Sequence, residues 1–111
     1  MEMDLNLIVL CGSIATEPEI RIFESGTRLI RYLVTVRSEA PRRRVDVVPV
    51  IFWDPSDEEV AEPGKRGQRI WIGGSVQRRF WESPDGRRSR LEVIAEQINL
   101  KEVEELEPVT A

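Results

Sequence analysis

The 111-residue sequence contains no histidine and only one cysteine, and these shortages exclude several kinds of protein. Zinc sites are built mainly from cysteine and histidine, so we expect no metal site. Cys11 cannot form an internal disulfide and is interpreted as a small buried hydrophobic residue. Histidine is also the most common general base, and no pair of carboxylates stands out in its place. We therefore expect no enzymatic activity, no cofactor and no small-molecule substrate.

Long hydrophobic segments are missing as well. The longest apolar run, Leu7 to Cys11, has five residues, whereas a membrane-spanning helix needs about 20. Glu2 and Asp4 stand where a secretory signal peptide would carry basic residues. These features predict a cytoplasmic protein with no membrane partner. The length fits one domain, and a hydrophobic content of 41% is ordinary for a folded chain.

A net charge of −4 argues against a nucleic-acid partner until the charge is divided along the chain. Residues 21–45 carry seven arginines against two acids, and residues 63–90 carry eight basic residues against two acids. The segments before, between and after these two blocks are acidic. Of the 16 basic residues, 14 are arginine, which both forks onto phosphate and stacks on bases. Because local charge decides what binds, the two basic blocks permit a nucleic-acid partner.

Alternating apolar and polar residues predict five strands and one short helix. Ser56 and Glu59 have the spacing of a capping box and predict a helix that ends before Pro63. The Asp85–Gly86 pair predicts a tight hairpin turn. Pro49 cannot donate to a ladder, so its strand needs a free edge or an irregularity there. The strands are expected at residues 5–12 with extended structure resuming at 20–23, then at 28–37, 45–53, 68–81 and 87–100.

The order of these elements, with the helix between the third and fourth strands, is that of the OB-fold. We therefore predict an all-β, five-stranded Greek-key barrel. Residues 1–100 form this domain, and residues 101–111 form an acidic C-terminal tail.

Two tryptophans fall on the outer faces of predicted strands, where exposed indoles call for an explanation. Trp53 lies opposite the inward-facing Val50 and Phe52, and Trp81 ends the fourth strand. Stacking of single-stranded bases is one interpretation, because every base has a face that can stack. Packing in a subunit interface is the other. Phe80 breaks the alternation and either stacks a base or fills the mouth of the barrel.

Arginines accompany these aromatic residues. Binding to phosphates, with release of counterions, is the interpretation we favour for the clusters. The alternative is a solvated surface that pairs with the acidic segments, although surface ion pairs contribute only about 0–1 kcal/mol. The candidate phosphate-binding residues are Arg37, Arg42, Arg43, Arg44, Arg78, Arg79, Arg87, Arg88 and Arg90.

Several short motifs follow one another in an order that is more specific than any of them alone. They are Asn6–Gly12, Glu17–Arg21, Ser25–Thr27, Val48–Trp53, Lys65–Gly74, Gln77–Trp81 with Asp85–Gly86, and Ala95–Leu100. Through them, residues 5–100 resemble the bacterial single-stranded DNA-binding proteins. The resemblance implies a homo-oligomer, a tetramer or a dimer, that binds single-stranded DNA with little sequence preference in replication, recombination and repair at the nucleoid.

The resemblance also implies roles for individual residues. Trp53 and Trp81 match positions at which family members stack bases, and Arg79 matches a basic position beside the second of these. Trp71 matches an aromatic position associated with subunit contact, and we assign it, together with Val48, to an oligomer interface.

Some features depart from the family pattern. Val47 stands where many members have another tryptophan, and Pro49 stands where many have a basic residue. Family members also carry a long flexible tail with an acidic, hydrophobic tip, and the present sequence shows no segment that resembles it. These departures favour a short paralogue or a primosome-type accessory protein of the same fold. Two alternatives stay open: a module that acts mainly through protein–protein contacts, and binding of single-stranded RNA.

Overall fold

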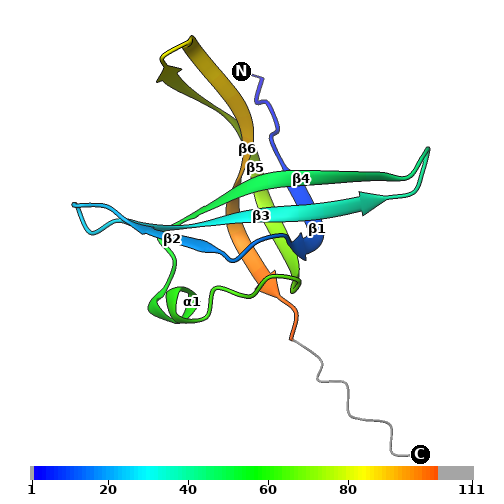
Figure 1. The fold of residues 1–111 in the computed structure, drawn as a ribbon, viewed down its shortest axis with the longest axis horizontal. Coiled ribbons are helices and arrows are strands. Elements are labelled where there is room, and N and C mark those ends of the chain that lie inside the picture. The colour runs from blue at the N-terminus through cyan, green and yellow to red at the C-terminus, as the bar shows by residue number, and fades with distance from the viewer. Residues whose placement is uncertain (1, 103–111) are drawn as a thin grey trace, which may run out of the picture.

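Alternating side chains along the strands produce one strongly twisted sheet that curls until its first and third strands meet (Figure 1). The computed structural model describes residues 2–102, so most of the predicted acidic tail, residues 103–111, lies outside the described residues. The elements in chain order are β1 (Ile8–Ile14), β2 (Glu19–Ile22), β3 (Arg28–Ser38), β4 (Arg44–Trp53), α1 (Asp57–Ala61), β5 (Arg69–Ser83) and β6 (Gly86–Leu100).

The sheet has the strand order β1-β5-β6-β4-β3-β2, and a short pairing of β1 with β3 closes it into a barrel. Strands β4 and β6 run parallel over Val50–Phe52, and all other pairs are antiparallel. The predicted all-β OB barrel is therefore confirmed. The strand count differs, because the chain breaks around Pro18 and the resumed extended segment forms the separate strand β2 beside β3. The short helix consequently lies between β4 and β5.

The barrel interior is filled by the residues that alternation places on the inner face. Its buried cluster is aliphatic apart from Tyr32, whose hydroxyl donates to the carbonyl oxygen of Pro63 at 2.7 Å. Burial, with a smaller contribution from the Glu59 carboxylate, raises the pKa of Tyr32 to about 12, so the phenol remains protonated. The cluster consists of Ile14, Ile30, Tyr32, Val34, Val50, Ile70, Ile72, Val93 and Ala95.

Helix α1 begins where the capping box predicts. The Ser56 hydroxyl accepts from the Glu59 amide at 3.1 Å, and the Glu59 carboxylate accepts from the Ser56 amide at 2.8 Å. Arg28 attaches this segment to β3, because its guanidinium donates to the Pro55 carbonyl and pairs with Asp57 at 2.9 Å. Within residues 2–102, no helix is long and apolar enough to cross a membrane.

A bulge at Gly73 and Gly74 shapes the longest hairpin. The register of β5 on β6 shifts at this pair, and a side chain at Gly74 would overlap the backbone carbonyl of Ile94. The backbones of β5 and β6 therefore approach each other closely at Gly74. Beyond the bulge, β5 and β6 stay paired up to Ser83 and Gly86, so the predicted Asp85–Gly86 turn is also confirmed.

Two long hairpins leave the barrel in different directions (Figure 1). The β5–β6 hairpin carries the second basic block, and the β3–β4 hairpin carries most of the first. In β4, pairing with β6 begins only at Val50, so Pro49 has a neighbour strand, β3, on one side only. This free edge satisfies the requirement that the proline imposes.

Candidate nucleic-acid interface

The outer face of β3, β4, β6 and β5 carries a small pocket of about 110 Å³. Its floor includes Leu29 and Ile51, which are buried although they lie on the face opposite the barrel core. The strand register brings these residues together, because Leu29 of β3 lies beside Trp53 of β4 and Ile51 of β4 lies beside Ile94 of β6. The pocket therefore combines an apolar floor with a polar rim. The lining residues are Leu29, Arg31, Ile51, Trp53, Gln77, Arg79, Glu92 and Ile94.

Trp53 forms one wall of this pocket and is 44% exposed. Phe23, which follows β2, stacks on its indole with the ring centroids 5.8 Å apart and the planes inclined by 20°. The Arg21 guanidinium lies 5.6 Å from the centre of the Phe23 ring. The indole is thus supported from the β2–β3 hairpin while part of it stays open to a ligand. Such support keeps the orientation of the ring fixed before anything binds.

The β5–β6 hairpin extends the same face away from the barrel. Arg79 lies directly opposite Arg90, and Trp81 lies directly opposite Arg88. The Arg79 guanidinium lies 5.4 Å from the centre of the Trp81 ring, in the range of a cation–π contact. The structure therefore brings Trp53, Arg79, Trp81 and Arg88 to one continuous face.

The other side of this hairpin carries a second set of predicted residues. Arg78 donates to the Ser89 hydroxyl at 3.1 Å, and the Arg87 guanidinium lies 4.5 Å from the centre of the Phe80 ring. Phe80 is 53% exposed, so it does not fill the mouth of the barrel. Because these residues alternate with Arg79 and Trp81, they lie on the opposite side of the ribbon.

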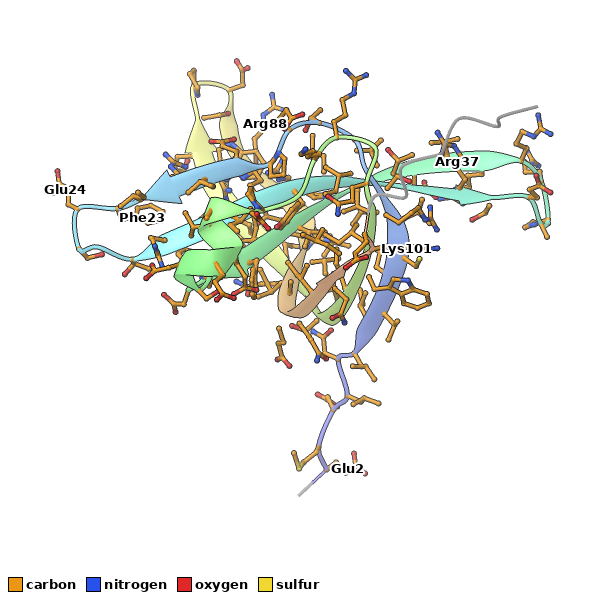
Figure 2. The ribbon with its side chains drawn as sticks, turned by 90° about the horizontal axis from the view of Figure 1, so that it is seen from below. Glu2, Phe23, Glu24, Arg37, Arg88 and Lys101 are labelled. Atoms are coloured by element: carbon orange, nitrogen blue, oxygen red, sulfur yellow. The ribbon has the colours of Figure 1, made fainter. Side chains whose placement is uncertain are left out.

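The arginines of the β3–β4 hairpin are not brought together with the tryptophans. Arg37, Arg42 and Arg43 are exposed, and Arg44 pairs with Asp46 at 2.9 Å. Figure 2 shows Arg37 at one end of the molecule and Phe23 at the other. A single ligand would have to be extended to reach both regions.

The two residues assigned to an oligomer interface have different positions. Trp71 lies on the outer face of β5, is 52% exposed and lines a hollow together with Val9 of β1. Val48 instead packs against the core cluster, because it shares the inner face of β4 with Val50. It is not retained as an interface residue.

Cys11, next to Trp71 in the β1–β5 register, is half-buried rather than buried. Its sulfur accepts from the Arg69 guanidinium at 3.3 Å. The interpretation of Cys11 as a buried hydrophobic residue is therefore wrong, because it lies on the outer face of β1, opposite the inward-facing Leu10.

Sequence reasoning did not select three residues that surround the predicted ones: Phe23, Arg31 and Glu92. Alternation already places Arg31 and Glu92 on outer faces, so their positions were readable from the strand pattern. Phe23 carries no such indication, because its partner Trp53 comes from another hairpin.

Comparisons with known proteins agree on one family. The model of the "Single-strand binding protein family" matches residues 5–101. The single-stranded DNA-binding protein of Halalkalibacterium halodurans is 28% identical over 103 residues, covering 88% of this chain and 61% of that protein. Single-stranded DNA-binding protein 2 of Listeria monocytogenes is also 28% identical over 103 residues, covering 88% and 64%. The chain thus spans less than two thirds of the length of these relatives.

A solved structure with the same fold is titled "Plasmodium falciparum SSB complex with ssDNA". It superimposes with a TM-score of 0.78 at 19% sequence identity, covering 92% of this chain and 99% of that one. At this identity the likeness establishes the OB-fold architecture.

Proposed function

Because the chain belongs to the single-strand binding protein family, we propose that it binds single-stranded DNA with little sequence preference. The observation that carries this proposal is the continuous outer face on which Trp53, Arg79, Trp81 and Arg88 lie together. The exposed Trp53 indole and the half-buried Trp81 indole, each beside a guanidinium group, suit a ligand with alternating bases and phosphates. The protein would protect or organise single strands during replication, recombination and repair, in the cytoplasm at the nucleoid. The function is binding, without a catalytic step.

In this proposal the two tryptophans bind the bases and the arginines bind the phosphates. Trp53 and Trp81 stack bases, which requires no particular base. Arg79 and Arg88 pair with the phosphates between them, and binding releases the counterions of those phosphates. Because the tryptophans use the faces of the bases rather than their edges, sequence has little influence.

The remaining predicted residues would contact the strand on either side of this face. Phe80, Arg78 and Arg87 offer a second aromatic and basic surface on the back of the β5–β6 hairpin. Phosphates farther along an extended strand would be bound by the exposed arginines of the β3–β4 hairpin, which are Arg37, Arg42 and Arg43. Arg44 would join them by exchanging its ion pair with Asp46 for one with a phosphate.

Fluorescence anisotropy with end-labelled oligonucleotides tests the function. We expect single-stranded DNA to bind at least tenfold more tightly than the duplex of the same sequence, because paired bases cannot reach the indoles. Equal affinity for both would contradict base stacking. A matched RNA strand that binds more tightly than the DNA would replace the proposed ligand by RNA, and absence of binding to any strand would favour the protein-contact module.

We further propose that the chain forms a homo-oligomer, a dimer or a tetramer, through the segment that precedes β1, the outer face of β1 and the adjoining part of β5. Leu5, Leu7 and Val9 follow one another on alternate positions and are 88%, 68% and 69% exposed. Trp71 on β5 adds an indole to this apolar strip. Apolar patches of this kind mark association sites, and a second copy of the chain fits the self-complementary interface of a dimer.

A charge placed in this strip should dissociate the oligomer. We expect Val9→Glu to reduce the mass measured by light scattering to that of one chain, because a carboxylate would be buried without a partner. Val47→Glu is the matched control, since Val47 is also an exposed valine, at 56%, on the outer face of β4. A mass that stays at one chain for the wild type, or that Val9→Glu leaves unchanged, would refute this interface.

A further inference from the structure

Among residues 2–102, Glu92 is the one buried charged residue, with 4% of its surface exposed. It lies on the outer face of β6, at the rim of the pocket beside Trp53. Arg90 donates to Glu92 Oε2 from Nε at 3.3 Å and from Nη2 at 3.1 Å. Arg79 approaches the same oxygen with Nη1 at 3.7 Å. One carboxylate oxygen therefore joins two guanidinium groups from neighbouring strands.

The position of this carboxylate follows from the register of the hairpin. Arg79 and Arg90 lie directly opposite each other, and two like charges in such a cross-strand pair repel. Glu92 is two residues from Arg90, so it shares its face and stands beside both guanidinium groups. Its negative charge offsets their repulsion and holds them together. The two arginine side chains remain 43% exposed, so each can still reach a ligand.

The arrangement continues outward to an aromatic ring. On the side toward the barrel, the Arg79 guanidinium pairs with Glu92. On the side toward the turn, it lies 5.4 Å from the centre of the Trp81 ring. Glu92 thus limits where Arg79 can point, and Arg79 in turn limits the Trp81 indole. On the pocket side, Arg31 Nε is buried and has no hydrogen-bond partner among the described residues.

We propose that Glu92 is a positioning residue for single-stranded DNA binding, an internal anion that holds Arg79 and Arg90 in place for the phosphates of the strand. This inference rests on the proposed function. For the DNA affinity of a variant without Glu92, it predicts the opposite change from the one that charge alone predicts. An acidic residue beneath a phosphate-binding face repels DNA, so its removal would tighten binding if charge alone mattered. If Glu92 positions the arginines, its removal weakens binding.

The test compares Glu92→Gln with Glu82→Gln, which removes an exposed carboxylate from the same hairpin. The affinity for oligo(dT) is measured at several salt concentrations. We expect Glu92→Gln to weaken binding about tenfold, equivalent to the loss of roughly one charge-assisted contact. The negative slope of log K against log salt should become shallower by about 0.7 to 1.4, as one or two phosphate contacts are lost on a single strand. Glu82→Gln should bind equally well or more tightly.

A second substitution separates position from charge. Glu92→Asp keeps the charge but withdraws the carboxylate from both guanidinium groups, and we expect it also to weaken binding. It serves in place of Glu92→Gln if circular dichroism shows that the glutamine variant is unfolded. Tighter binding by Glu92→Gln with an unchanged salt slope, or wild-type affinity in Glu92→Asp, would overturn the positioning role. Wild-type protein that binds no oligo(dT) would overturn the proposed function, and this inference with it.

Discussion

Replacing Trp53 and Trp81 together by alanine should weaken the binding of oligo(dT) by at least about 30-fold at constant salt. In single-strand binding proteins of this type, stacking of a base on an aromatic ring contributes about 1–3 kcal/mol per base. Both rings lie on the outer face and not in the core, so their loss removes stacking surface without emptying the barrel interior. Anisotropy titration with a labelled oligonucleotide measures the change.

The single substitutions should differ in a way that the structure explains. Phe23 stacks on Trp53 at 5.8 Å, so a base can move onto Phe23 when the indole is removed. Trp81 has an arginine beside it and no aromatic neighbour among the described residues. We therefore expect Trp81→Ala to weaken binding more than Trp53→Ala.

Trp71→Ala is the matched control for both tryptophans. Its indole is 52% exposed, but it lies on the part of β5 that pairs with β1. We expect this variant to change the oligomeric mass and to leave the intrinsic affinity for a short oligonucleotide nearly unchanged. Wild-type affinity in the double variant, or a larger loss in Trp71→Ala than in the double variant, would contradict the assignment of the DNA-binding face.

Adding a single methyl group at Gly74, by the substitution Gly74→Ala, should lower the free energy of unfolding strongly. Its Cβ would overlap the carbonyl group of Ile94, which belongs to the backbone of β6 and cannot move aside alone. Overpacking in a rigid core typically costs 1–3 kcal/mol, and a clash with backbone lies at the upper end of that range. We expect Gly74→Ala to lower the free energy of unfolding by about 3 kcal/mol and the melting temperature by roughly 10 to 20 °C.

Gly73→Ala is the control, because an added Cβ at Gly73 meets no heavy atom within 4 Å. The two variants change the same residue type at adjacent positions, so only the surroundings differ. Thermal unfolding followed by circular dichroism compares them. Similar melting temperatures for the two variants would show that the bulge does not hold β5 against β6 as the structure has it.

Much of the barrel could be predicted from the sequence because local patterns determine it. Alternation placed Tyr32 and Val50 inside and Trp53 outside, the capping box at Ser56 placed α1, and the Asp85–Gly86 pair placed the hairpin turn. Strand ends were less predictable. The predicted fourth strand stopped at Trp81, whereas β5 continues to Ser83, because cross-strand pairing with β6 extends it to the turn.

The candidate site was harder to predict, because it depends on contacts between distant segments. Phe23 reaches Trp53 only through the packing of the β2–β3 hairpin, and the charge of Glu92 gives no indication that two arginines bury it. Alternation was sufficient to exclude Val48 from an outer surface, but its expected role in an interface came from family resemblance. The two basic blocks were visible in the sequence. The sequence did not show that the β3–β4 and β5–β6 hairpins carry them in different directions, because those directions depend on how the barrel closes.

Tryptophan fluorescence during titration with oligo(dT) tests most directly whether the outer face binds single-stranded DNA. At low salt and micromolar protein, we expect the emission to be quenched as bases stack on Trp53 and Trp81, with saturation at a defined ratio of nucleotides to protein. The quench should reverse as salt is added, because phosphate contacts release counterions. Emission that remains unchanged up to saturating oligonucleotide at low salt would contradict the proposed binding of single strands by this face.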